Sequence, residues 1–361
     1  MEMSDVGFLG LGISVLIHVL FVTITMGVGW ITAFSRYIAY RKNDVSLEKF
    51  ARRTFRVLVV FELFSGVWGT IITVFLAGFF PTLTALATNV LFAPLLIALI
   101  SIMIRLPSIG IFWYTWDKIH PRIHSTIGFI MAISGFTIPF GFRAIFSEIT
   151  APTAIAEFVA KGFATAFASY SSIVFWLLYL HTVFAALSVG GFVVAFISSL
   201  DKDLNGIKIG NRYGLYFLIA QVPIGLFYWL SLRDFSYYMF DKITFGSFLP
   251  ILALKITVAL VLLIIAVIAI SAKDKIKYQY PVILSLLVVF LGELMNSGAR
   301  YPYMVILGKE GIHFSNFLNF YIEIPMTAVF VILAFLVVSI IIFSAALFYT
   351  VFKRYLLEFP E

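Results

Sequence analysis

The sequence lacks cysteine altogether and is poor in charged residues. The absence of cysteine excludes disulfides, thiol catalysis, zinc–cysteinate sites and iron–sulfur clusters. Only 12% of the 361 residues are charged, whereas 62% are apolar or aromatic, and ordinary soluble domains have roughly 25% charged residues. These proportions exclude a soluble fold. The phosphate-binding glycine motifs, HExxH and GxSxG are also absent, so nucleotide hydrolysis and peptidase chemistry have no support.

The charges occur in short clusters, and the uncharged stretches between them have the length of membrane-spanning helices. About 20 helical residues cross the hydrocarbon core of a bilayer. A transmembrane barrel does not fit, because residues 258–270 are continuously apolar rather than alternating. We therefore predict an all-α fold, a polytopic helical bundle that forms one membrane domain over residues 1–361. Its nine predicted spans are 6–35, 54–79, 90–115, 123–147, 169–199, 212–232, 247–271, 280–297 and 322–352.

Lysine and arginine alternate between the links and predict the direction of the chain. They gather after the first, third, fifth, seventh and ninth spans. By the positive-inside rule these links are cytoplasmic, which places the N-terminus outside and the C-terminus inside the cell. The formal net charge of +7 is explained by this topology rather than by nucleic acid. Because Glu2 and Asp5 replace the basic start of a signal peptide, we expect the first segment to remain a span of a multi-pass cell membrane protein.

Charged residues and histidines inside the spans are candidate functional residues, because burial in hydrocarbon is costly. His18, His181, Lys255 and Glu293 are predicted to lie in the outer half of the membrane. Each histidine is the only one in its span. A neutral imidazole in an apolar bundle is a suitable axial ligand for haem iron, while the alternative is a hydrogen bond to a neighbouring carbonyl.

Glu62 and Arg105 form a second set of charges within the spans. Counting about 1.5 Å per residue, both lie roughly 20 Å from the outer surface on consecutive spans. We therefore expect an ion pair that ties the second span to the third, with a proton relay as the alternative. For Glu293 two interpretations stay open, namely an iron-binding or proton-carrying carboxylate and a structural, ion-paired one.

Several segments resemble the large subunit of the cytochrome bd-type quinol oxidases. The segment from His18 to Gly27, HVLFVTITMG, is similar to the first helix of that subunit, where the histidine binds haem. Further similar segments follow in order, and the resemblance is strongest up to about residue 200. They are Phe92-Ala93-Pro94-Leu95, Trp116-Asp117 with His124 beyond it, Leu180-His181-Thr182-Val183 and Gly298-Ala299-Arg300-Tyr301-Pro302-Tyr303.

The resemblance implies cofactors, a substrate and partners. In that family three haems lie near the outer face, and electrons from a quinol reduce dioxygen to water. His18 would bind an active-site haem and His181 a low-spin haem b, with haem d as a further candidate cofactor. Lys255 and Arg300 would neutralise haem propionates, and Glu293 would bind iron or carry a proton. The implied partners are membrane lipid, the quinol and a second membrane subunit.

The sequence also departs from the family at positions that matter for the chemistry. Thr257 stands where the family has a methionine ligand, and two glutamates of the third helix are replaced by Ala98 and Arg105. Ser297 stands at a carboxylate ligand, although Glu293 lies one helical turn earlier. The quinol-binding loop is shortened to 233–246.

Three functions follow from these patterns. The first is a haem-binding subunit that passes electrons from quinol through haem b toward dioxygen. The second is a degenerate partner subunit that keeps the fold and some haem but performs no oxygen chemistry. The third is a haem-free transporter that uses the same buried charges, against which the segment around His18 argues.

Overall fold

The computed structural model describes residues 3–271 and 277–317, together with the isolated positions 327, 334, 338 and 345. Within these residues the chain is an all-α bundle with one short hairpin. Eight of the described helices are long and apolar enough to cross a membrane. Apart from the four isolated positions, the ninth predicted span, 322–352, lies outside the described residues.

The eight long helices correspond to the first eight predicted spans. They are α1 (Met3–Lys42), α2 (Val45–Phe79), α4 (Phe92–Tyr114), α5 (Pro121–Thr150), α7 (Ile173–Leu200), α8 (Leu204–Phe235), α10 (Leu249–Ser271) and α11 (Gln279–Gly298). Further short elements, which the sequence did not predict, lie between these helices or follow α11. These are α3 (Pro81–Asn89), α6 (Ala154–Lys161), η1 (Ala168–Tyr170), α9 (Tyr237–Thr244), the antiparallel pair β1 (Tyr303–Leu307) and β2 (Glu310–His313), and η2 (Phe314–Phe317).

The first two helices are longer than predicted, because the basic segment between them is helical. Arginine and lysine are good helix formers, so a charge cluster marks the edge of the hydrocarbon rather than the end of a helix. The helices are separated only by Asn43 and Asp44. Asp44 caps α2, since its side chain accepts a 3.0 Å hydrogen bond from the Leu47 backbone N–H.

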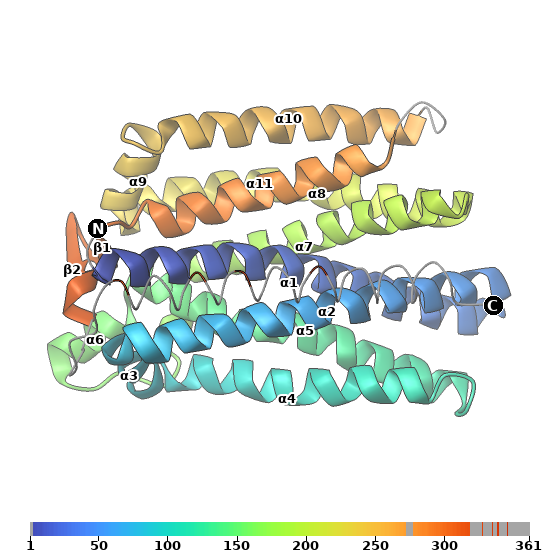
Figure 1. Cartoon of the computed structure of the whole chain (residues 1–361), viewed down its shortest axis with the longest axis horizontal. Helices are drawn as coiled ribbons and strands as arrows, with labels where there is room; N and C mark the ends of the chain where they lie inside the picture. The colour runs from blue at the N-terminus through green and yellow to red at the C-terminus, as the bar shows by residue number, and fades with distance from the viewer. Residues whose placement is uncertain are drawn as a thin grey trace.

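The long helices run side by side, so that the short elements gather at one end of the bundle (Figure 1). The N-terminus, α3, α6, α9 and the β1–β2 pair lie at this end, on the left of the figure, which we call the hairpin end. The links between α1 and α2, α4 and α5, and α7 and α8 lie at the opposite end, which we call the basic end. Three of the predicted basic clusters therefore share one end, as the positive-inside rule requires.

Glycines bring α1 and α7 into backbone contact at the centre of the bundle. A Cβ atom on Gly27 would overlap the carbonyl oxygen of Ala186, and one on Gly190 would overlap the backbone of Gly27. Such close approach strengthens helix association in membranes, where no hydrophobic force draws helices together. The contact joins the helix that carries His18 to the helix that carries His181.

Candidate functional site

His181 projects from α7 against α8, and one of its ring nitrogens lacks a hydrogen-bond partner. The ring lies against Gly225, where a Cβ atom would come within 2.9 Å of His181 Cε1. Gln221 Nε2 is 3.2 Å from His181 Nε2. Nδ1 is buried without any hydrogen-bond partner among the described residues. An unpaired buried nitrogen is costly in an apolar bundle, so the site fits a bound group that contacts this ring.

Two basic side chains act on this histidine, and a second arginine and a carboxylate lie beside one of them. Arg143 on α5 forms a short ion pair with Glu293 on α11, and Arg300 follows the end of α11. Both guanidinium groups lie over the Phe146 ring, at 5.5 and 5.6 Å from its centroid. Lys255 on α10 and Arg143 are close enough to His181 to act on it electrostatically.

The cluster of His181, Lys255, Arg143, Arg300 and Glu293 has more positive than negative charge. Arg143, Glu293 and Arg300 are each less than 10% exposed. Arg143 Nη1 and Arg300 Nε and Nη2 are buried donors without acceptors in the described part of the chain. Because unpaired charges in a membrane are expensive, these donors fit an anionic group with several acceptor oxygens. The two propionates of a haem have that chemistry.

The structure brings four of the predicted site residues together in this cluster, namely His181, Lys255, Glu293 and Arg300. It adds Arg143, which the sequence analysis missed. Arg143 lies inside the fourth predicted span, 123–147, so the rule that singled out the other charges would have found it. Of the two interpretations of Glu293, the structure shows the ion pair, and a role at the iron or in proton transfer stays a prediction.

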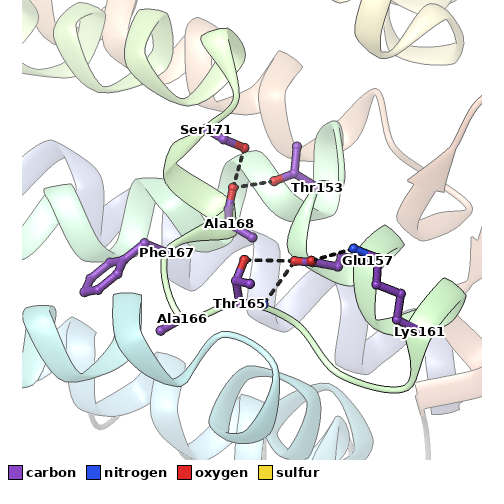
Figure 2. Close-up of a pocket in the computed structure, with 8 residues that line it drawn as sticks. All are labelled: Thr153, Glu157, Lys161, Thr165, Ala166, Phe167, Ala168 and Ser171. Carbon is purple, nitrogen blue, oxygen red and sulfur yellow. Dashed lines mark hydrogen bonds and ion pairs between the residues drawn. The ribbon is translucent and has the colours of Figure 1, made fainter.

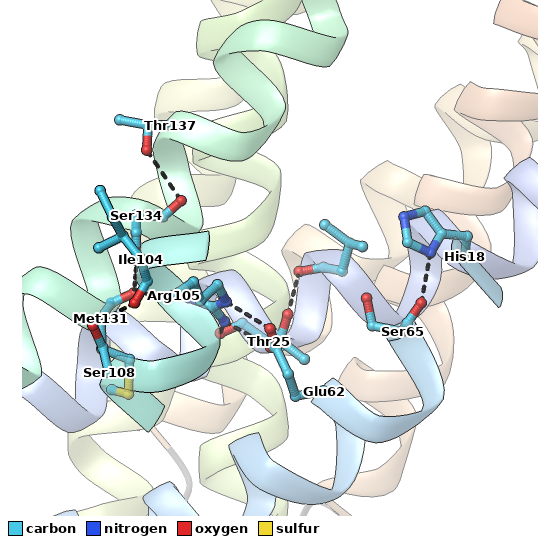
Figure 3. A network of polar contacts seen from close by, with 11 residues as sticks. His18, Thr25, Glu62, Ser65, Ile104, Arg105, Ser108, Met131, Ser134 and Thr137 are labelled. Atoms are coloured by element: carbon cyan, nitrogen blue, oxygen red, sulfur yellow. Dashed lines mark hydrogen bonds and ion pairs between the residues drawn. The ribbon is translucent and has the colours of Figure 1, made fainter. Parts of the chain in front are cut away.

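His18 projects from α1 toward α2, in an arrangement that fixes its tautomer (Figure 3). His18 Nδ1 is 2.9 Å from the Ser65 carbonyl oxygen. A carbonyl only accepts, so Nδ1 carries the hydrogen and Nε2 presents a lone pair. Histidines that bind a metal through one ring nitrogen typically donate a hydrogen bond from the other nitrogen, as His18 Nδ1 does here. A Cβ atom on Gly69 would come within 3.2 Å of the ring, so the absent side chain leaves room for the imidazole.

The predicted pair of Glu62 and Arg105 is confirmed, and it lies in the same network as His18 (Figure 3). Arg105 Nε and Nη2 donate to the two Glu62 carboxylate oxygens at 2.7 and 2.8 Å. Arg105 Nη1 donates to the Met131 carbonyl oxygen at 2.9 Å, and Nη2 is 3.4 Å from the Thr25 carbonyl oxygen. The pair thus links α1, α2, α4 and α5, and it also lies one helical turn from Ser65.

His124 is held in a different way, although it belongs to the family-like segments. Its Nε2 donates to the Phe112 carbonyl oxygen at 2.8 Å, and its Nδ1 accepts from Arg36 Nε at 3.1 Å. Both nitrogens are therefore satisfied, and His124 stabilises the basic end of the bundle. Among the described residues no group of three or more metal-ligating side chains occurs. The candidate metal sites in this part of the chain are therefore those where one imidazole has a nitrogen available to bind a metal.

A pocket of about 640 Å³ opens at the hairpin end, between α6 and η1 (Figure 2). Its charged groups satisfy each other. Glu157 accepts from Lys161 Nζ at 3.1 Å and from the Thr165 N–H and hydroxyl, both at 3.0 Å. These bonds, first that of the Thr165 N–H and then that of Lys161, lower the pKa of Glu157 below its ordinary value. The Glu157 carboxylate therefore joins α6 to the following loop at Thr165 and so stabilises the wall of the pocket.

We expect the link from α6 to η1 to loosen in acid. A carboxyl whose folded-state pKa is depressed stabilises the fold above its unfolded pKa, and this contribution is lost as pH falls through the folded pKa. Hydrogen exchange at the Thr165 amide, corrected for intrinsic rates, should therefore lose protection as the pH falls below the ordinary glutamate pKa of 4.5. Glu157→Gln should remove most of that pH dependence. An unchanged pH profile in this variant would contradict the assignment.

Comparisons with known proteins identify the family and the fold of the chain. A family model described as cytochrome bd terminal oxidase subunit I matches residues 9–228. The solved structure of bd oxidase from Geobacillus thermodenitrificans is similar in fold, with a TM-score of 0.81 at 15% sequence identity. That match covers 98% of each of the two chains. No curated protein sequence matches. The matched family range includes His18, Glu62, Arg105, Arg143 and His181.

Proposed function

The chain belongs to the family of subunit I of the cytochrome bd terminal oxidases, and from this premise we propose that it is a haem-binding membrane subunit of a quinol:oxygen oxidoreductase. It is a multi-pass protein of the cell membrane, with eight helices of spanning length among the described residues. Oxidases of this family are membrane hetero-oligomers that act on quinol, so the proposed partners are quinol and a second membrane subunit. Haem b is the proposed cofactor, with haem d as a candidate at a second site.

The observation that carries the proposal is the cationic cluster around His181. Arg143 and Arg300 present buried donors without acceptors, beside an imidazole with an unpaired nitrogen. In this arrangement His181 would bind the iron, while Arg143 and Arg300 would bind the propionates. When bound, haem supplies one-electron transfer and, where an iron position stays open, a site for dioxygen. The two arginines would also favour the negative charge of the propionates in a medium of low polarity.

His18 is the second proposed ligand. The Ser65 carbonyl oxygen orients its ring and keeps the hydrogen on Nδ1, so that the Nε2 lone pair is available without further rearrangement. The Glu62–Arg105 pair lies one turn away on the same face of α2 and restrains this part of the helix. The contacts His18–Ser65 and Glu62–Arg105 therefore fix the position and the orientation of one imidazole ring.

The test of the proposal is a reduced-minus-oxidised absorbance spectrum of the purified protein, together with haem extraction. Haem of b type should be present at a stoichiometry of at least one per chain. A protein purified from haem-replete cells with no haem would contradict the proposal and would favour a transporter.

A second candidate function, a degenerate partner subunit, is favoured by Arg105. Arg105 Nε, Nη1 and Nη2 donate to Glu62, Met131 and Thr25, so the side chain holds the helices together. It stands where the resemblance puts a glutamate of the proton path. A spectrum with b-type bands alone, and no red-shifted band of haem d, would support the partner function. A haem d band would support the catalytic subunit.

Glu293 is proposed either to bind the haem iron or to pass a proton inward from the outer face. Glu293→Gln tests this role. The amide keeps the shape of the side chain but removes its charge, and it leaves Arg143 without its carboxylate. We expect one haem to change its spin state or midpoint potential while the circular dichroism of the bundle stays the same. Glu157→Gln, the same change at the hairpin end, is the control. If spectra and potentials match those of the control, Glu293 has only a structural role.

A further inference from the structure

The helix opposite His181 carries a further basic side chain, Lys255, for which the described residues provide no hydrogen-bond partner. Helices α7 and α10 each pack against both α8 and α11, so they lie diagonally in a group of four helices (Figure 1). Cofactors in helical bundles are held by side chains that project inward from facing helices. His181 lies about 12 Å from the hairpin end of α7, and Lys255 about 9 Å from that end of α10, at roughly 1.5 Å per residue. The two side chains therefore belong to the same level of the group.

Lys255 points into this group of helices and is not bound by a carboxylate. A Cβ atom on Gly292 of α11 would lie 3.0 Å from Lys255 Nζ, so the absence of a side chain there leaves room for the amine. No hydrogen bond or ion pair within the described residues holds Nζ. Glu293, the acidic group that acts on it electrostatically, forms its ion pair with Arg143.

The other donors of α10 are directed elsewhere. Among residues 249–271 only Lys255, Thr257 and Ser271 have side-chain nitrogen, oxygen or sulfur atoms. Thr257 is exposed and its hydroxyl donates to the Ala253 carbonyl oxygen at 2.9 Å. Ser271 lies at the far end of the helix and donates to the Val267 carbonyl oxygen. Lys255 is thus the one side chain of α10 that can offer a lone pair to a group bound by His181.

The charge balance of the cluster favours an uncharged amine at this place. With both propionates ionised, the ferric iron and its porphyrin ring carry one net positive charge. The three positive charges of Arg143, Arg300 and the iron porphyrin then balance the three negative charges of Glu293 and the two propionates. A charged Lys255 would add an uncompensated positive charge to a buried site, which is unfavourable in a membrane.

We propose that the neutral amine of Lys255 is a second iron ligand of the haem that His181 would hold. This inference rests on the proposed function, because it needs the haem. Binding would use the lone pair of Nζ, so a Lys255 side chain that is protonated before the haem binds would release one proton to solvent. No oxidant or reductant is consumed, and the role of Lys255 changes from the charge partner expected from the sequence to an iron ligand.

The experiment compares the purified wild-type protein with Lys255→Arg and Lys255→Met by electron paramagnetic resonance and near-infrared magnetic circular dichroism. His181→Ala identifies the signal of the haem in question. Arginine keeps the positive charge but stays protonated and cannot bind iron, whereas methionine removes the charge and supplies a thioether ligand. Lys208→Arg, at an exposed position of α8, is the matched control.

We expect the His181 haem to be low-spin in the wild type, with the near-infrared band of histidine–amine ligation. Lys255→Arg should convert it to a high-spin form that binds carbon monoxide when reduced. Lys255→Met should keep it low-spin with the band of histidine–methionine ligation. A high-spin wild type, or a low-spin Lys255→Arg protein, overturns the proposal while leaving His181 as a haem ligand. If Lys255→Arg does not assemble, the wild-type and Lys255→Met bands decide. A protein without haem overturns the proposed function itself.

Discussion

His181→Ala is expected to remove one haem from the purified protein, and His18→Ala a different one. Each histidine is the only one in its helix in the outer half of the predicted membrane, and each has a ring nitrogen that the described residues leave available. An alanine side chain offers no ligand, and the weak remaining interactions of the haem with the apolar helices would not retain it through purification. The loss should be close to one full equivalent in each variant.

Haem extraction and the reduced-minus-oxidised spectrum measure this loss directly. His313→Ala is a suitable control, because that histidine lies in β2 outside the spanning helices and contacts Ser315 within its own turn. Two different difference spectra are expected for His18→Ala and His181→Ala, since the two sites differ in charge. Full haem content with an unchanged spectrum in both variants would show that neither histidine is a ligand.

Loss of one partner of the Glu62–Arg105 pair is expected to destabilise the bundle by roughly 3–5 kcal/mol, because it leaves an uncompensated buried charge. The Arg105 side chain is 2% exposed and that of Glu62 16%. Arg105→Met would leave the Glu62 carboxylate without its two donors, and Glu62→Leu would leave Arg105 with backbone carbonyls alone. The double variant Glu62→Leu/Arg105→Met removes both charges, so it should be more stable than either single variant.

Reversible unfolding in mixed detergent micelles is the measurement, with a double-mutant cycle to extract the coupling. The exposed pair Arg233 and Asp234, whose side chains are each 60% exposed, provides the control. Its removal should cost less than about 1 kcal/mol. A double variant that is as unstable as the sum of the two single variants would refute the coupling between Glu62 and Arg105.

The positions of Glu62 and Arg105 along their helices, converted to a depth in the membrane, were enough to predict the pair from the sequence. In a membrane bundle the position of a residue along its helix fixes its distance from the surface, and a buried charge must find a partner at the same distance. The same reasoning placed Lys255 and Glu293 in the same half of the membrane as His181, while Arg300 was singled out by the family resemblance. Depth did not reveal which charges pair, because pairing depends on the rotation of each helix about its axis. Glu293 therefore contacts Arg143, which no sequence argument had connected with it.

The short elements at the hairpin end escaped prediction for a different reason. Helices α3, α6 and α9 have only eight or nine residues each, too few for the long apolar run that identifies a span. Their amino acids are a mixture of apolar and polar residues that is equally typical of a loop. Glu148, for example, accepts hydrogen bonds from the backbone N–H groups of Thr153 and Ile155 at the start of α6. This capping contact bridges residues that are separated in sequence by a turn, so only the fold reveals it.

The glycine contact between α1 and α7 sets the spacing of the two proposed redox centres. Because Gly27 and Gly190 meet backbone to backbone, no flexible side chain lies between the two helices at that point. The rate of electron tunnelling falls steeply as the distance between donor and acceptor increases. Small relative movements of the two ligand-bearing helices would therefore make the rate of electron transfer fluctuate. Two glycines that allow the backbones to touch would limit such motion, and so would keep the distance between the proposed centres nearly constant.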